Sequence, residues 1–130
     1  MRRVVIVGAG GHGQVVADIL LAAAAQGWAG RPIGFVDDDR RLTQTSILGL
    51  PVLGTVAELP RVDCDAVIVA IGDNRTRHRL SALVREMKVE LAQAIHPRAT
   101  IGAGTRLGSG VVICAGATVG TGTTVGDGAI

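Results

Sequence analysis

The chain has 130 residues, of which 48% are hydrophobic, 18% charged and only 2% aromatic, and its formal net charge is +2. The small charge excess and the scarcity of aromatic side chains for base stacking argue against a nucleic-acid partner. No apolar run approaches the roughly 18 residues of a membrane span, so no membrane partner is expected. Cys64 and Cys114 lie far apart and outside any C-x-x-C motif, which indicates reduced thiols and a cytoplasmic protein.

The chain begins with the pattern of a strand, a glycine loop and a helix. Val4–Val7 is a run of β-branched residues, typical of a buried strand in a parallel sheet. The loop that follows, "GAGGHG" from Gly8 to Gly13, has the spacing G-x-G-x-x-G of phosphate-binding loops. A helix is predicted from about residue 12 to residue 26, and its apolar positions are Val15, Val16, Ile19 and Leu20.

The middle of the chain repeats this alternation. Further strands are predicted over residues 31–37, where three aspartates end the run, over 48–54, and over 65–71. Thr55 and Glu58 have the spacing of a helix capping box. A second helix is predicted over residues 75–88, with an apolar face formed by Leu80, Leu83, Val84 and Met87. The alternation predicts a Rossmann-like α/β domain with a parallel sheet over residues 1–93.

The composition changes at about residue 94, and residues 101–130 divide into five hexads: IGAGTR, LGSGVV, ICAGAT, VGTGTT and VGDGAI. The first place is always aliphatic and the fourth is always glycine, and Ile95 fits as the start of a degenerate earlier hexad. Each hexad predicts one short strand and one corner, with the aliphatic residue inside and glycine allowing positive φ at the corner. Three hexads form one triangular turn, so residues 94–130 predict about two turns. A flexible glycine-rich tail is the alternative, but it would not keep an aliphatic residue in phase five times.

The hexads resemble the left-handed parallel β-helix of hexapeptide acyltransferases. Together with "VGAGGHGQVVADIL", "GFVDDD", "AIGDNRTR" and "IHPRATIG", they resemble the NeuD/PglD-type sugar acyltransferases. The resemblance implies a small Rossmann-like domain followed, over residues 94–130, by the start of a left-handed β-helix. It also implies a homotrimer that transfers an acetyl group from acetyl-CoA, without a metal, to an amine or hydroxyl of a UDP- or GDP-linked sugar.

The same resemblance points to two groups of substrate-binding residues, and a position at the carboxyl end of a strand, where open sheets bind ligands, suggests a third. The glycine loop is expected at the phosphates or the sugar, where helix N–H groups favour an anion. The aspartates after the second strand are expected at the nucleoside, although a solvated turn is the alternative. The third group follows the strand over 65–71, where the asparagine also suits a helix N-cap and the arginine also suits a surface charge. The candidates are Gly10, Gly11, His12, Gly13, Asp37, Asp38, Gly72, Asn74 and Arg77.

No catalytic residue is assigned within these 130 residues. In the family the general-base histidine follows a hexad like "VGDGAI", so it is expected beyond Ile130, and the acetyl-CoA site is expected mostly there too. His12, His78 and His96 do not occupy the matching place, so residues 1–130 alone are expected to be inactive. The alternatives are a non-catalytic nucleotide-sugar-binding module and a fragment of an NAD-dependent oxidoreductase, the latter based on G-x-G-x-x-G alone.

Overall fold

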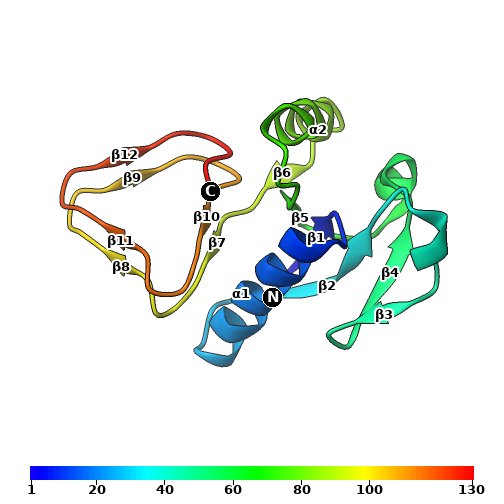
Figure 1. Ribbon diagram of the computed structural model, residues 1–130, viewed down its shortest axis with the longest axis horizontal. Helices are drawn as coiled ribbons and strands as arrows, with labels where there is room; N and C mark the ends of the chain where they lie inside the picture. The colour runs from blue at the N-terminus through cyan, green and yellow to red at the C-terminus, as the bar shows by residue number, and fades with distance from the viewer.

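The computed structural model describes residues 1–130 and contains an α/β part beside a triangular repeat (Figure 1). The helices are α1 (Gly11–Ala25) and α2 (Asn74–Glu86), with short 3-10 helices η1 (Arg40–Leu42) and η2 (Val56–Arg61). The sheet strands are β1 (Arg2–Val7), β2 (Gly30–Val36), β3 (Ser46–Ile47), β4 (Leu50–Gly54), β5 (Ala66–Val69) and β6 (Glu90–Leu91). No helix has the length and apolar character that a membrane crossing demands.

The six strands form one sheet in the order β3-β4-β2-β1-β5-β6. All neighbouring pairs are parallel except β3 with β4, which are antiparallel. The chain moves outward from β1 to β2 and β4, and then returns to the other side of β1 as β5. This order is that of half a Rossmann fold, and the reversal between β1 and β5 is its topological switch point. The predicted α/β class with a parallel sheet is therefore confirmed.

Alternate residues of β1 build the two faces of the core. Val4 and Ile6 belong to the cluster on the α1 face, whereas Val5 and Val7 belong to the cluster on the α2 face, and all four are fully buried. This alternation follows from the two-residue side-chain period of a strand. The continuous apolar run in the sequence is thus the signature of a strand covered on both faces.

Two residues predicted to lie on buried helix faces are exposed. The side chain of Val15 in α1 is 44% exposed and that of Leu83 in α2 is 37% exposed. The buried face of α1 is centred on Val16, Ile19 and Leu20, and a helix turns by about 100° per residue, so Val15 lies beside that face. The buried face of α2 is likewise narrower than predicted and contains Leu80, Ser81 and Val84.

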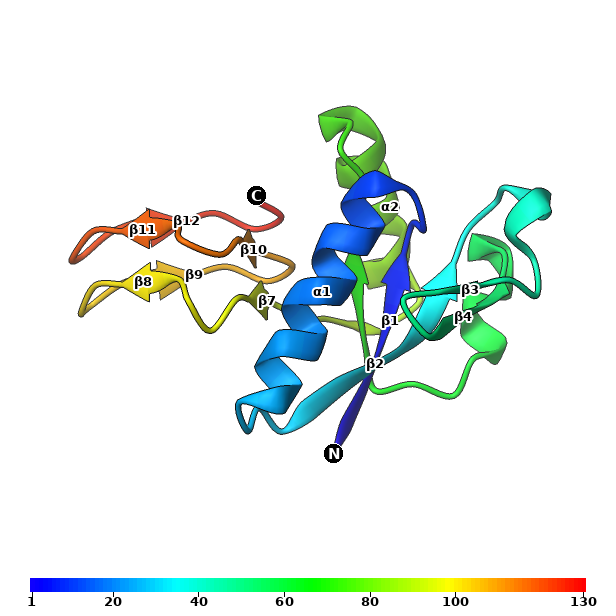
Figure 2. The same cartoon turned by 60° about the horizontal axis from the view of Figure 1, so that its bottom comes forward.

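The repeat contains six two-residue strands: β7 (Ala94–Ile95), β8 (Thr100–Ile101), β9 (Arg106–Leu107), β10 (Val112–Ile113), β11 (Thr118–Val119) and β12 (Thr124–Val125). They pair in parallel as β7 with β10, β8 with β11 and β9 with β12, so each residue lies beside the residue 18 positions later. Three hexads therefore make one turn, as predicted. Figure 2 shows the two turns stacked on one another, with the lower turn beside α1.

Glycine has a separate task at each of its two places in the hexad. The fourth-place glycines all have positive φ, for example 71° at Gly104 and 72° at Gly128, which other residues rarely adopt. The second-place glycines of the lower turn leave room for the turn above, because a Cβ at Gly102 would lie 2.7 Å from Thr121 Cα. The glycines of the lower turn thus follow from corners and from stacking.

The repeat packs on α1 and shares its core. Ala94 of β7 and Val112 of β10 are buried in the same cluster as Val16 and Leu20 of α1, and Cys114 packs against that cluster. His96 lies next to this contact, where its Nδ1 accepts a hydrogen bond from the Arg98 N–H at 3.0 Å. The His96 side chain therefore stabilises the turn at Pro97 and Arg98. The proline also disfavours a helical backbone at His96.

Candidate functional site

The candidate site lies at the carboxyl end of the sheet, where the loops after β1 and β5 meet at the switch point. Gly8 has a φ of 107°, and a Cβ there would lie 2.7 Å from the Ala70 carbonyl oxygen in the loop after β5. A Cβ at Gly13 would lie 2.8 Å from the Gly8 carbonyl carbon. These two glycines are therefore needed for close backbone packing within the protein. Gly10 and Gly11, in contrast, border open space, with no heavy atom within 4 Å of an added Cβ.

The first turn of α1 faces that open space without a side-chain cap. Its N-cap is Gly10, which makes no side-chain hydrogen bond to the helix, and no acidic residue occupies the first turn. The first N–H groups of a helix have no partner within the helix, and the helix dipole adds partial positive charge there. The loop is thus suited to bind an anion such as a phosphate.

His12 carries the one buried side-chain nitrogen or oxygen atom of the protein that has no hydrogen-bond partner, its Nε2. Burial lowers the pKa of the imidazole below its ordinary value of 6.5, and the positive charge of Arg77 lowers it further. The imidazole is therefore held in its neutral form, in which one ring nitrogen donates and the other accepts a hydrogen bond. An unpaired buried Nε2 beside the glycine loop is a position that a bound ligand would satisfy.

Asp37 connects the end of β2 to the glycine loop. Its Oδ2 accepts a hydrogen bond from the Ala9 N–H at 2.8 Å, and its Oδ1 accepts one from the Asp39 N–H, also at 2.8 Å. Asp38 is exposed, and its Oδ1 accepts a hydrogen bond from the Val56 N–H at 3.0 Å, at the start of η2. Both carboxylates thus accept hydrogen bonds from backbone N–H groups, but only Asp38 is also exposed to solvent at the edge of the site.

The third predicted group lies at the start of α2. The N-cap there is Asp73, whose Oδ2 accepts hydrogen bonds from the Thr76 N–H and hydroxyl, at 2.9 and 2.7 Å. These bonds lower the pKa of the Asp73 carboxyl below its ordinary value. The alternative that Asn74 is the N-cap is therefore wrong, and its Oδ1 instead accepts a hydrogen bond from Arg77 Nη2 at 2.6 Å.

Arg77 is engaged by the protein itself. Besides Asn74, its guanidinium donates to the carbonyl oxygens of Ile71 at 3.0 Å, Gly72 at 3.3 Å and Gly128 at 3.0 Å. A description as a surface charge is therefore wrong. The structure brings together, around the switch point, the glycine loop with His12 and Asp37 and the start of α2 with Gly72, Asn74 and Arg77. Asp38 lies beside them and contacts the start of η2.

A large cavity lies at the other end of the sheet. It has a volume of about 620 Å³, and its wall includes Trp28 of the turn after α1. The ion pair between Arg2 and Glu90, at 3.0 Å, forms part of the same wall. We locate the candidate site at the carboxyl end instead, because ligands of open parallel sheets bind there and because the unpaired His12 Nε2 is there. No group of three or more His, Cys, Asp or Glu side chains is arranged to hold a metal ion.

Comparison with known proteins gives concordant matches. Residues 3–84 match the family model of the PglD N-terminal domain. The chain is 31% identical to the UDP-N-acetylbacillosamine N-acetyltransferase of Bacillus subtilis over 117 residues, which cover 87% of this chain and 51% of that protein. It spans little more than half the length of such relatives.

Two solved structures give the same result. One is a mutant of the perosamine N-acetyltransferase from Caulobacter crescentus in complex with CoA and GDP-perosamine, with a TM-score of 0.86 and 36% identity over 96% of this chain and 57% of that one. The other is the acetyltransferase domain of PglB from Neisseria gonorrhoeae, with a TM-score of 0.83 and 37% identity over 98% of this chain and 60% of that one. A second structure of the PglB domain contains acetyl coenzyme A.

Proposed function

Because the chain belongs to the PglD N-terminal domain family, we propose that it is the acceptor-binding part of an acetyl-CoA-dependent N- or O-acetyltransferase acting on a nucleotide-linked sugar. The observation that carries the proposal is the open glycine loop at the switch point, with an uncapped helix start and an unpaired His12 Nε2. The relatives described above are sugar N-acetyltransferases, and one of their structures contains GDP-perosamine together with CoA. The nucleotide is thus part of a substrate and not a redox cofactor.

The glycine loop takes the diphosphate in this proposal. The backbone of Gly10, Gly11 and Gly13 offers N–H groups, and His12 Nε2 donates to or accepts from the diphosphate or the sugar. Asp38 is the better placed carboxylate for a ribose hydroxyl, since it is exposed, whereas Asp37 holds the loop in shape. Gly72 and Asn74 border the same edge from the loop after β5 and the start of α2.

The two parts of the chain have separate tasks in this proposal. Residues 1–93 form the nucleotide-sugar-binding domain, and residues 94–130 form the start of a left-handed parallel β-helix. The 18-residue pairing of β7 to β12 and the positive φ of every corner glycine support the second assignment. Since this chain covers only about half of its relatives, the acetyl-CoA site and the general base are assigned to none of these residues.

The cellular setting belongs to the same proposal. A cytoplasmic location, where nucleotide-linked sugars and acetyl-CoA meet, is supported by the two free cysteines. Burial raises the pKa of the Cys64 thiol, which keeps it protonated and poorly reactive.

Calorimetry tests the substrate class directly. Residues 1–130 are titrated with GDP-perosamine, a UDP-linked amino sugar, UDP, GDP and NAD, and we expect a sugar nucleotide to bind more tightly than NAD. Binding of NAD without a response to either sugar nucleotide would overturn the proposal. In a thiol-release assay with acetyl-CoA and the same acceptors, this polypeptide is expected to stay at background, because only the acceptor is held in place. Turnover would contradict that expectation.

A further inference from the structure

Arg77 joins the two parts of the chain through a single planar group. Three of its acceptors belong to the α/β part, namely the carbonyl oxygens of Ile71 and Gly72 and Oδ1 of Asn74. The fourth is the carbonyl oxygen of Gly128, which lies 51 residues away in the upper turn of the repeat and is reached by Nε at 3.0 Å. A guanidinium presents its donors in a fixed fork, so the positions of all four acceptors are set relative to one another.

Gly128 belongs to a corner that other contacts also hold. We use the name repeat corner for residues 107–110 of the lower turn and 126–128 of the upper turn. Gln93 Nε2 donates to the carbonyl oxygens of Leu107 and Gly108 at 3.2 and 2.9 Å. Within the corner, the Gly128 N–H donates to the Ser109 carbonyl oxygen at 2.9 Å.

The other end of the same guanidinium network is the candidate site. Ile71 and Gly72 follow β5, and the Ile71 side chain lies where a Cβ on Gly8 would collide with it, 2.8 Å away. Burial lowers the pKa of the His12 imidazole, and the positive charge of Arg77 lowers it further. A shift of the loop after β5 would therefore move the hydrogen-bond acceptors of Arg77, and through them the repeat corner.

We propose that Arg77 is a positioning residue, which holds the repeat corner in a set orientation to the glycine loop and transmits occupation of that loop to the repeat. This inference rests on the proposed function, since the occupant is the sugar nucleotide. The role differs from direct substrate binding, because the guanidinium is already engaged by four protein oxygen atoms.

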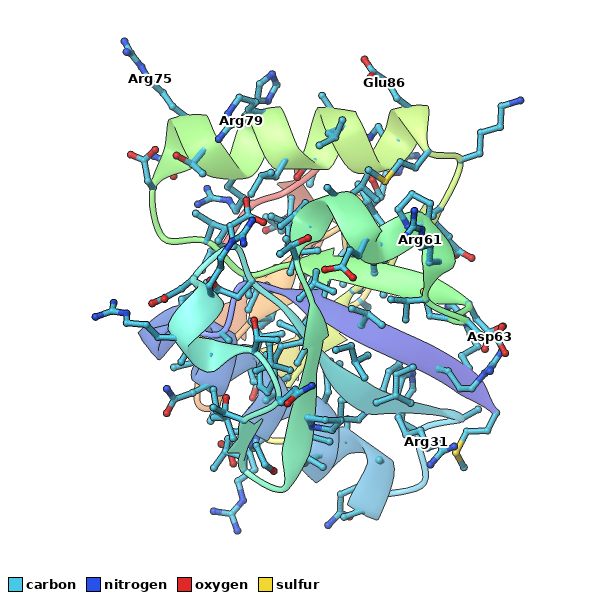
Figure 3. All side chains as sticks on the ribbon, turned by 90° about the vertical axis from the view of Figure 1, so that its right-hand side faces the viewer. Arg31, Arg61, Asp63, Arg75, Arg79 and Glu86 are labelled. Carbon is cyan, nitrogen blue, oxygen red and sulfur yellow. The ribbon has the colours of Figure 1, made fainter.

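Amide hydrogen exchange, measured residue by residue and without any ligand, tests whether Arg77 holds the repeat corner in place. In Arg77→Gln and Arg77→Lys, the Gly128 amide is expected to exchange roughly ten- to a hundredfold faster, as loss of a charge-assisted hydrogen bond allows. The internal control is the Gly122 amide, which donates to the Ala103 carbonyl oxygen at 2.9 Å in the equivalent place of another corner. The matched control variants are Arg75→Gln and Arg79→Gln, whose side chains project from the outer side of α2 (Figure 3).

The lysine variant separates the charge of Arg77 from its geometry. It keeps a positive charge near His12, so the pKa of His12 measured by NMR stays low, but one ammonium cannot reach acceptors on both sides as the fork does. In the glutamine variant the pKa of His12 rises. Unchanged Gly128 exchange in both Arg77 variants, or equal acceleration at Gly122, would overturn the proposal.

The transmission of loop occupation to the repeat is tested with saturating GDP-perosamine or a UDP-linked amino sugar. Slower exchange at Gly128 is expected in the unmodified protein and in Arg79→Gln, but not in Arg77→Lys. Equal slowing in Arg77→Lys would overturn transmission through Arg77. If neither sugar nucleotide binds the unmodified protein, the proposed function and the transmission both fail, whereas the ligand-free comparison still decides the positioning role.

Discussion

Asp37 and Asp38 are adjacent in sequence but differ in what their carboxylates hold. Asp37 accepts a hydrogen bond from a backbone N–H with each oxygen, at 2.8 Å to Ala9 and to Asp39. Asp38 accepts one such bond, from Val56. An asparagine keeps the shape of either side chain but replaces one acceptor oxygen with a donor, so the two positions respond differently to the same substitution.

Asp37→Asn is expected to lower the free energy of unfolding by about 1–3 kcal/mol, because its amide NH2 must face a backbone N–H. It is also expected to weaken sugar-nucleotide binding by disturbing the glycine loop. Asp38→Asn retains an acceptor for the Val56 N–H. We therefore expect this variant to bind the sugar nucleotide more weakly but to lose little stability. Urea unfolding and calorimetry on both variants check this; equal stability of the two variants would contradict the assigned roles.

His12 makes the stability of the protein depend on pH. Its folded-state pKa lies below the ordinary value of 6.5, chiefly because of burial and then because of Arg77. Protonation therefore favours the unfolded state, and the stabilisation due to the neutral imidazole is present above pH 6.5 and is lost as the pH falls from there through the folded-state pKa.

His12→Asn is expected to remove this part of the pH dependence. Between about pH 6.5 and pH 5, the free energy of unfolding should fall less in the variant than in the unmodified protein. Urea unfolding at a series of pH values measures the difference between the two curves. Parallel curves across that range would show that the imidazole is not held neutral by the fold.

At the scale of the element, the hexad strands are two residues long and depend on the glycines between them. Gly102 lies beneath the upper turn, where an added Cβ would be 2.7 Å from Thr121 Cα, whereas Gly126 lies in the upper turn with nothing within 4 Å. Both occupy the second place of a hexad, and neither has a positive φ. Comparison of the same alanine substitution at Gly102 and at Gly126 therefore isolates the effect of stacking between the turns.

Gly102→Ala is expected to cost about 1–3 kcal/mol of unfolding free energy, because the two turns must separate to admit the methyl group. Gly126→Ala is expected to be neutral or slightly stabilising, since alanine restricts the unfolded chain. Thermal or urea unfolding of the two variants makes the comparison. A loss of the same size at Gly126 would mean that backbone freedom, and not stacking, explains the glycine at this place.

The elements were predictable to different degrees for physical reasons. The hexad phase predicted the three-hexad turn because each aliphatic residue must point inward at every sixth position. The capping-box spacing is likewise realised, with Glu58 Oε1 accepting from the Thr55 N–H at 3.1 Å, although η2 is a 3-10 helix. Periodicity did not reveal how wide the buried faces are, because that width depends on what covers each helix, and Val15 and Leu83 were misplaced for this reason.

At the scale of the whole molecule, the hydrogen bonds by which Arg77 and Gln93 join the two parts have no sequence pattern. The oxygen that Arg77 reaches is the main-chain carbonyl of Gly128, and Gln93 also binds main-chain carbonyls, so no complementary side chain marks either contact. The position of the candidate site, in contrast, was predictable, since strand ends and the glycine loop converge in any such sheet. The hydrogen bonds of Asp37 with Ala9 and of Arg77 with Gly128 go to backbone groups distant in sequence, so no local pattern predicts them.

The repeat carries few charges on its flanks, since Arg98, Arg106 and Asp127 are the only charged residues from 94 to 130. Weakly charged flanks favour side-by-side association, and the family resemblance implies three copies, so we expect residues 1–130 to form a homotrimer with three times the 13.3 kDa mass of the chain. Light scattering over a concentration series measures this mass. A single-chain mass at every concentration would contradict the expectation, and masses that grow without limit would indicate end-to-end stacking of the upper turn instead.

The pairing of each repeat residue with the one 18 positions later constrains how such a segment changes length. Insertion of one residue between the turns would bring Val125 beside Gly108 instead of Leu107, and would move every corner glycine after the insertion out of its corner. Insertion of whole hexads keeps strands and corners in alternation. Insertion of three hexads also returns each strand to the same side of the triangle. Related segments are therefore expected to differ by complete turns, and small insertions between them are expected to bulge outward at corners.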